Sequence, residues 1–79
     1  METPYQLIDN EAAKQYEFHL DGKMPYIEYI KAKNRIYLTH TEVPRSLEGK
    51  GVASAIVLAA LQDIDQKDLI LVPMCPFVA

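Results

Sequence analysis

The sequence predicts an α/β domain with a mixed, mainly antiparallel sheet that includes one βαβ unit. Residues 15–43 alternate polar and apolar side chains and are interrupted by turn residues, which is typical of half-buried antiparallel strands. Residues 50–65 are rich in Ala and Leu and contain no Gly or Pro after Gly51, which favours a helix. Residues 69–74 form a near-continuous apolar run, which indicates a further strand.

The first half of the chain predicts an antiparallel meander. Asp21-Gly22 is the strongest hairpin signal in the sequence, and Lys33-Asn34 is a second turn. Residues 10–14 form a turn with helical character between two earlier segments. We expect strands over residues 5–9, 15–20, 23–31 and 35–43.

The second half predicts a parallel crossover. Residues 50–65 are apolar nearly all round until Gln62, which describes a buried helix. The run at 69–74 suits a strand that is buried on both faces. Because strand–helix–strand connections in one sheet are right-handed, the strands on either side of this helix should be parallel.

Length and composition limit the class of protein. The chain has 79 residues, enough for a single domain over 1–79 and too few for two. A core of this size supplies only ~3–5 kcal/mol, and the lone Cys75 cannot form an internal disulfide. A ligand or a partner subunit is therefore expected to add stability.

Charge and residue spacing disfavour several partners. The net charge is −3 with no basic block, so nucleic acid is not expected. His19, His40 and Cys75 are scattered, so no metal site is expected. The longest apolar run, 52–61, is shorter than the ~20 residues of a membrane span, and residues 1–4 do not resemble a secretory signal. We expect a cytoplasmic protein.

The loop at residues 44–51 has two glycines around Lys50 at the predicted helix start. Free N–H groups and the positive end of the helix dipole suit a phosphate group there. A Walker A loop is excluded, because Gly51 stands where Ser or Thr would bind magnesium. A dinucleotide fingerprint fits poorly, because Ser54 occupies its third glycine position. A simple glycine turn with a solvated Lys50 is the alternative.

Three blocks of sequence, in order, resemble the GNAT superfamily of N-acetyltransferases, and a short single-domain branch of it in particular. They are HTEVP at 40–44, EGKGVASA at 48–55 and VPMCPF at 72–77. The family's acetyl-coenzyme A loop reads Gln/Arg-x-x-Gly-x-Gly/Ala. Gly51 and Ala53 match its last two positions, and Glu48 departs from the first. The resemblance covers residues 15–79.

The resemblance implies a GNAT-like acyl-CoA N-acyltransferase fold, here short at its C-terminal end, and acetyl-CoA as cofactor. Backbone N–H groups of the loop would hold the pyrophosphate, and the preceding strand end would pair with the pantetheine in a gap between splayed strands. Cys75 would lie close to the thioester. The residues implied in cofactor binding are Thr41, Val43, Glu48, Gly49, Lys50, Gly51, Val52 and Ala53.

The residues themselves point to the same edge of the sheet, because ligands of open α/β sheets bind beyond the carboxyl ends of the strands. Simple alternation places His40 on a face with Ile36, Leu38 and Glu42. Histidine is a common general base near neutral pH, so His40 is a candidate base, and Glu42 could orient it or bind an amine. A structural histidine and an exposed carboxylate are the alternatives. Cys75 is a candidate nucleophile or proton donor, or simply a small hydrophobe.

The predicted function is acetyl transfer from acetyl-CoA to an amine of unknown identity, directly or through an acetyl-Cys75 intermediate. The oxyanion would be held by a strand N–H near Val43. The alternative is a non-catalytic acyl-CoA-binding or protein-interaction module. The sequence also predicts self-association through the exposed edge of the strand at 69–74, or else only marginal stability as a monomer.

Overall fold

The computed structural model describes residues 5–20 and 22–74 and consists of one five-stranded sheet and one long helix. The strand order is β1-β2-β3-β4-β5, and β4 and β5 are parallel while every other neighbouring pair is antiparallel. The predicted mixed α/β fold is therefore confirmed. The elements in chain order are β1 (Ile8–Asn10), β2 (Gln15–Glu17), β3 (Tyr26–Ala32), β4 (Arg35–Glu42), the 3-10 helix η1 (Arg45–Leu47), α1 (Val52–Gln66) and β5 (Ile70–Pro73).

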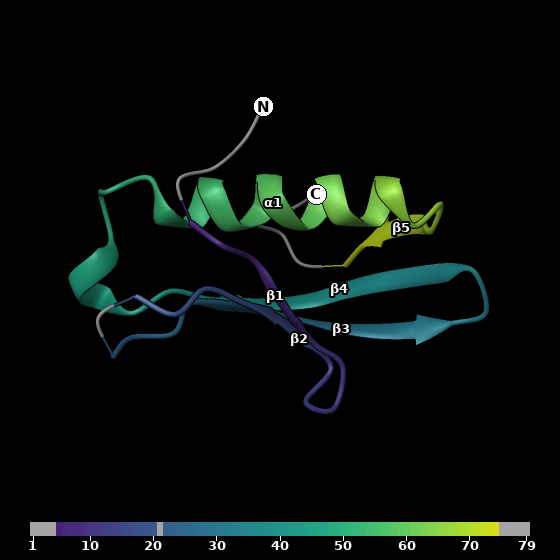
Figure 1. Cartoon of the computed structure of the whole chain (residues 1–79), viewed down its shortest axis with the longest axis horizontal. Helices are drawn as coiled ribbons and strands as arrows, with labels where there is room; N and C mark the ends of the chain where they lie inside the picture. Colours follow the sequence, from purple (N-terminus) through teal and green to yellow (C-terminus); the bar gives the residue numbers. More distant parts are fainter. Residues whose placement is uncertain (1–4, 21, 75–79) are drawn as a thin grey trace.

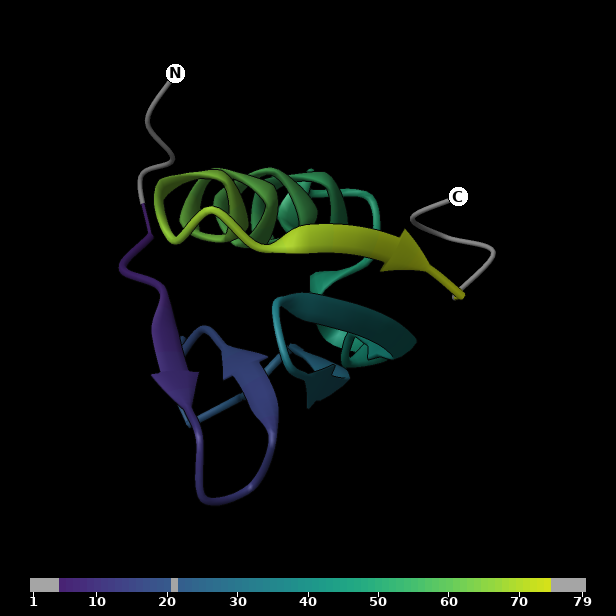
Figure 2. The same ribbon diagram turned by 90° about the vertical axis from the view of Figure 1, so that its right-hand side faces the viewer.

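The helix α1 packs on one face of the sheet, which we call the inner face; the opposite side is the outer face (Figure 1). Turned by 90°, the sheet is seen to curve, so that β1 and β5, at its two edges, both approach α1 (Figure 2). The chain passes from β4 through η1 and α1 to β5, which is the predicted βαβ unit. This topology brings the end of β4 and the start of α1 to the same end of the molecule (Figure 1).

The core lies between α1 and the inner face. Val52, Ile56, Ala60 and Ile64 recur every four residues on α1 and are all buried, because this spacing keeps them on one side of a helix. Their counterparts on or beside the strands are Tyr16, Phe18, Ile27, Tyr29, Ile36 and Leu38. Aromatic and branched side chains thus fill the space between the helix and the sheet.

Two sequence expectations about burial are wrong. Most other positions of α1 are half-buried and a few are exposed, so the helix is buried along one side and not all round. β5 is not buried on both faces either, because Leu69 and Leu71 pack against the core while Ile70 is 48% exposed. The physical reason is that this fold has only two described layers, so each element can bury a single side.

Strand β2 is shorter than expected and ends at Glu17. Leu20 and Lys23 form only an isolated bridge, and the expected Asp21-Gly22 turn lies partly outside the described residues, since Asp21 is not among them. Gly22 has a φ of 78°, a conformation that favours glycine. The hairpin between β3 and β4 turns at Lys33-Asn34 as predicted, with Lys33 in the left-handed region at a φ of 58°.

An irregularity in β4 changes which side chains face inward. Glu28 pairs with His40 and Tyr29 with Leu38. Thr39 therefore lies between two successive pairs of the ladder and is an extra residue in β4, which makes a β-bulge. Ile36 and Leu38 are buried in the inner face. Beyond the bulge Thr41 pairs with the buried Ile27 and also faces inward, while His40 faces outward with Glu28.

A polar network ties the C-terminal half of α1 to the sheet. The Tyr16 hydroxyl donates to Asp63 at 2.8 Å, and Lys67 bridges Asp63 at 2.8 Å and Asp9 at 2.9 Å. The Tyr29 hydroxyl donates to the other oxygen of Asp9. Burial and the hydrogen bond to Asp63 raise the pKa of Tyr16, so its hydroxyl remains a donor over the whole physiological range.

Among the residues that the structure describes, no helix is long and apolar enough to cross a membrane.

Candidate functional site

The loop between β4 and α1 presents backbone N–H groups at the start of a long helix. Gly51 is the N-cap of α1 with a φ of 75°, and no side chain caps the helix there. The first turn contains no acidic residue, so the positive end of the helix dipole is not neutralised locally. A Cβ added at Gly49 or Gly51 would meet no other atom within 4 Å, so the backbone is accessible from outside at both positions.

A cavity of about 460 Å³ lies beside this helix start, lined by residues 41–43, 47–49 and 51–54. It joins the end of β4 to the first turn of α1. Its volume falls in the range of small-molecule sites, roughly 300–1,000 Å³. The cavity therefore combines an uncapped helix N-terminus with a strand end, and a phosphate-bearing ligand fits that combination.

Strands β4 and β5 pair over only part of their length. The parallel ladder joins residues 35–38 to residues 70–73, and the Met74 N–H donates to the Leu38 carbonyl at 3.0 Å. Within the described part of the chain, the pairing goes no further, although β4 continues to Glu42. The last part of β4 thus has one edge paired with β3, and its other edge is not joined to β5.

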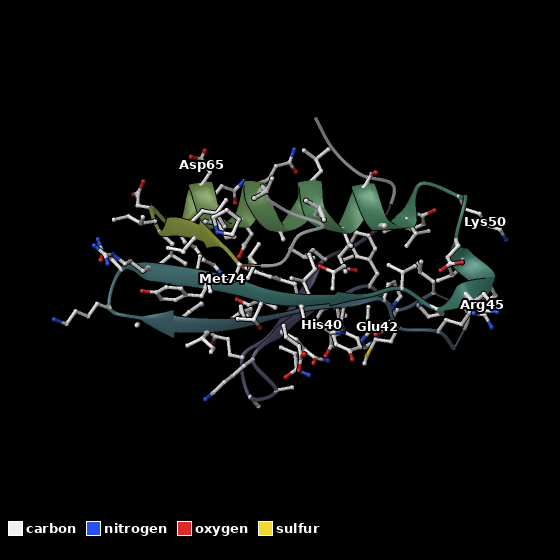
Figure 3. The ribbon with its side chains drawn as sticks, turned by 180° about the vertical axis from the view of Figure 1, so that it is seen from behind. His40, Glu42, Arg45, Lys50, Asp65 and Met74 are labelled. Atoms are coloured by element: carbon white, nitrogen blue, oxygen red, sulfur yellow. The ribbon has the colours of Figure 1, made fainter. Side chains whose placement is uncertain are left out.

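His40 and Glu42 form a pair on the outer face, with His40 Nε2 and Glu42 Oε1 3.1 Å apart. Both side chains are about half exposed, and the Tyr26 ring lies 6.4 Å from the His40 ring between centroids. Figure 3 shows the two labelled side chains next to each other on the side of the sheet away from α1. Their position contradicts the sequence expectation that His40 shares a face with Ile36 and Leu38, because the bulge at Thr39 reverses the alternation.

Arg45 and Lys50 lie at the same end of the molecule as the cavity (Figure 3). Arg45 begins η1 and Lys50 lies in the loop just before α1, and both are exposed. Lys50 does not line the cavity. These cations add to the positive field of the helix start, while Glu48, which lines the cavity, adds a negative charge.

The structure brings most of the candidate cofactor residues together. Thr41, Val43, Glu48, Gly49, Gly51, Val52 and Ala53 all line the cavity, and so does the candidate catalytic residue Glu42. His40 lies next to Glu42 but does not line the cavity, and Cys75 lies outside the described residues.

Two cavity residues were not identified from the sequence. Leu47 lies on η1 and packs against the core, and its signal was an isolated apolar residue in a polar loop. Ser54 lies in the first turn of α1 and has no distinctive signal. The described residues contain no group of three or more His, Cys, Asp or Glu side chains that could hold a metal ion.

These features are those of α/β domains that bind a phosphate-bearing ligand where a strand end meets a helix N-terminus. The sequence model of the GCN5-related N-acetyl-transferase family matches residues 15–79, which is most of the chain. The chain therefore belongs to the GCN5-related N-acetyltransferase family, and the resemblance found in the sequence is confirmed.

Proposed function

We propose that this protein binds acetyl-CoA at the cavity between β4 and α1 and transfers the acetyl group to an amine. The observation that carries the proposal is the uncapped N-terminus of α1, which opens onto a cavity of about 460 Å³. Membership of a family of acetyltransferases supports it. Acetyl-CoA supplies an activated acyl group as a thioester, and the remaining requirements fall on the chain's own residues.

The first requirement is to hold the diphosphate of the cofactor. The N–H groups of residues 49–53 are the proposed donors, because Gly49 and Gly51 leave the backbone accessible and α1 directs its positive end there. Glu48 stands where the family has Gln or Arg, so backbone groups and not this side chain are proposed to carry the contact.

The second requirement is to stabilise charge on the acetyl oxygen. A backbone N–H near Val43 is the proposed donor, because Val43 follows the end of β4 and lines the cavity. Fixed amide dipoles that face a developing oxyanion stabilise the transition state without reorganising. The amine nitrogen forms a bond to the carbonyl carbon, and the carbon–sulfur bond then breaks to release coenzyme A as a thiolate.

The third requirement is to remove a proton from the amine. His40 is the proposed base, acting directly or through water, and Glu42, whose Oε1 lies 3.1 Å from His40 Nε2, holds its ring in place. The pair lies on the outer face beside the unjoined segment of β4, so the amine is proposed to approach from that side. The alternative route, through an acetyl-Cys75 intermediate, remains part of the proposal.

Ligand binding is tested first. Acetyl-CoA at a hundred times its Kd adds about 2.7 kcal/mol to the free energy of unfolding, which raises the Tm by roughly 10–20 °C for a domain of this size. S-acetylpantetheine, which lacks the diphosphate, should give a much smaller shift. Equal shifts with the two compounds would exclude the loop as the phosphate site, and no shift at millimolar acetyl-CoA would exclude acetyl-CoA binding.

Catalysis is tested separately, with isotopically labelled acetyl-CoA and a panel of amines. We expect transfer by the unaltered chain and a loss of about 10²–10⁴-fold in kcat for His40→Ala, the usual contribution of a general base. Intact mass with and without Cys75→Ala decides between the direct and the acetyl-Cys75 routes. A protein that shows the thermal shift but no transfer to any amine would be the non-catalytic acyl-CoA-binding module.

A further inference from the structure

Three apolar side chains form one row across the outer face of the sheet. Ile30 on β3 pairs with Tyr37 on β4, and Tyr37 pairs with Val72 on β5, so all three point to the same side. Ile70 lies two residues before Val72 and shares its side. We call Ile30, Tyr37, Ile70 and Val72 the outer row. Ile30 is 54% exposed and Ile70 is 48% exposed.

The outer row is on the face that α1 does not cover. Leu69 and Leu71 pack against the core under α1, so Ile70 and Val72 must point the other way. In the part of the chain that the structure describes, α1 is the only long helix, and it lies on the inner face (Figure 2). Apolar side chains this exposed, side by side on adjacent strands, are typical of an interaction surface.

The charges on either side of the outer row have opposite signs. Toward the β3–β4 hairpin the outer face carries Arg35, with Lys33 in the turn beyond it. In the other direction it carries Glu28, which pairs with His40, and then Glu42. Arg35 lies two residues before Tyr37, and Glu28 lies two residues before Ile30, or about 7 Å along their strands. Both are exposed, and no ion pair to either occurs among the described residues.

This arrangement is complementary to itself. A twofold axis through the outer row would place Arg35 of one copy over Glu28 of the other, and the same contact would occur twice. We propose that the outer face binds a second copy of this chain, with the two outer rows packed together and Arg35 paired with Glu28 across the interface. Sheets that pack face to face lie about 10 Å apart, a gap that arginine and glutamate side chains can span together.

The size of the face is adequate for such a dimer. A stable interface buries about 800 Å² on each partner, and the molecule measures 35 × 24 × 22 Å with the sheet along its length. Pairing through the free edge of β5, the mode predicted from the sequence, is less favourable. β5 has four residues and ends in Pro73, which has no N–H to donate.

The proposal does not rest on the acetyl-CoA site. The cavity lies between β4 and α1, away from the outer row, so cofactor binding and dimer formation can be measured independently. His40, as the partner of Glu28 on β4, comes to lie at the rim of the dimer contact.

Sedimentation of the full chain over a concentration series tests the dimer. The expected result is a rise from 9.0 kDa to twice that mass. Arg35→Glu and Glu28→Arg should each weaken association at least about tenfold, because each places two like-charged pairs across the interface. The double variant should restore association, since it exchanges the two charges. Asp65→Arg, an exposed change on α1, is the control and should have no effect.

Three outcomes would overturn the proposal. A chain that stays at 9.0 kDa up to millimolar concentration does not dimerise. A dimer that is insensitive to both single variants uses another surface, the β5 edge being the first to examine. A double variant that associates no better than the singles shows that Arg35 and Glu28 do not meet. Circular dichroism of every variant confirms that the fold is retained.

Discussion

Gly51 shows how a single backbone conformation positions the candidate site. Its φ of 75° turns the chain into α1 and leaves the first N–H groups of the helix without a side-chain cap. A residue with a Cβ is strained in this conformation by about 1–2 kcal/mol. Glycine here therefore relieves strain and also keeps the backbone open on the cavity side.

We predict that Gly51→Val abolishes the thermal shift caused by acetyl-CoA, because its branched side chain would cover the N–H groups beside the cavity. Gly22→Val is a matched control, since Gly22 has a φ of 78°, equally open surroundings and no part in the cavity. Both variants should lose similar stability, and only Gly51→Val should lose the shift. A normal shift in Gly51→Val would mean that the loop does not hold the phosphates.

Glu17 is a carboxylate with only 3% of its surface exposed, on the outer face of β2. Asn10 and Gln15 donate to one of its oxygens at 2.9 and 2.6 Å, and His19 contacts the other at 2.8 Å. Burial by itself would raise the pKa of Glu17, but the hydrogen bonds from His19, Gln15 and Asn10 outweigh it and lower the pKa below 4.5.

The lowered pKa of Glu17 predicts a stability that depends on pH. Because the folded pKa lies below the unfolded value, the contribution is complete above about pH 4.5 and is lost as the pH falls through the folded pKa. We expect Glu17→Gln to cost about 1–3 kcal/mol at pH 7, since a neutral amide has one acceptor oxygen in place of two and loses the charge that strengthens these hydrogen bonds. It should also flatten the acid limb of the stability curve. Urea unfolding at a series of pH values measures both effects. An acid limb of unchanged steepness would contradict this assignment.

At the scale of the element, the bulge in β4 decides the orientation of the residues that follow it. Ile36 and Leu38 face the core before Thr39, and Thr41 faces inward after it. The alternation therefore changes from even to odd positions within one strand. The bulge sends His40 and Glu42 to the outer face beside the segment of β4 that β5 does not join.

We predict that deleting Thr39 removes the bulge without reversing the faces. Leu38 and His40 then become consecutive residues opposite Tyr29 and Glu28, so the ladder is regular and His40 stays on the outer face. The free energy of unfolding, measured in urea, should therefore change by less than about 1 kcal/mol. Thr39→Val, which keeps the bulge, should change it by less than about 0.5 kcal/mol. A deletion variant that is largely unfolded would show that the fold requires the bulge itself.

The polar network at the far end of α1 has a different role from the site. Lys67 contacts both Asp63 and Asp9, and these two hydrogen bonds raise its pKa. The network joins β1, β2 and β3 to the C-terminal part of α1, while the cavity lies at its N-terminus. The polar network and the candidate site thus lie at opposite ends of the same helix.

At the scale of the whole molecule, one core joins α1 to the sheet. The buried side chains of α1 and of the strands form a single cluster, and the polar network links the first strand to the last turn of the helix. No described element has a core of its own, so none can gain stability alone. The expectation of one domain over residues 1–79 therefore remains a prediction with a direct test.

We predict a single cooperative unfolding transition. Far-UV circular dichroism follows the helix and sheet. Tyrosine fluorescence follows the five tyrosines, which include the core pair of Tyr16 and Tyr29 with ring centroids 5.1 Å apart. The two signals should have the same midpoint in urea, and the midpoint should rise with protein concentration if the outer face forms a dimer. Separate midpoints for the two signals would indicate two independent units.

By itself, the sequence determined the order of the elements, the family and the position of the loop. Local patterns suffice for these features, because each pattern acts through the backbone of neighbouring residues. The patterns are the alternation of polar and apolar side chains, a segment without Gly or Pro, and the glycines beside Lys50. The sequence also contained a sign of the bulge. The apolar residues are at even-numbered positions in β4, Ile36 and Leu38, and at the odd-numbered Val43 just after it.

Only the tertiary structure decided which faces these residues occupy. The outward direction of His40 depends on how β4 pairs with β3, and the one-sided burial of β5 depends on α1 covering a single face. The cavity arises only when the end of β4 and the start of α1 meet. Each of these features depends on contacts between segments distant along the chain, and a one-residue change in strand register reverses the faces while leaving the local pattern unchanged.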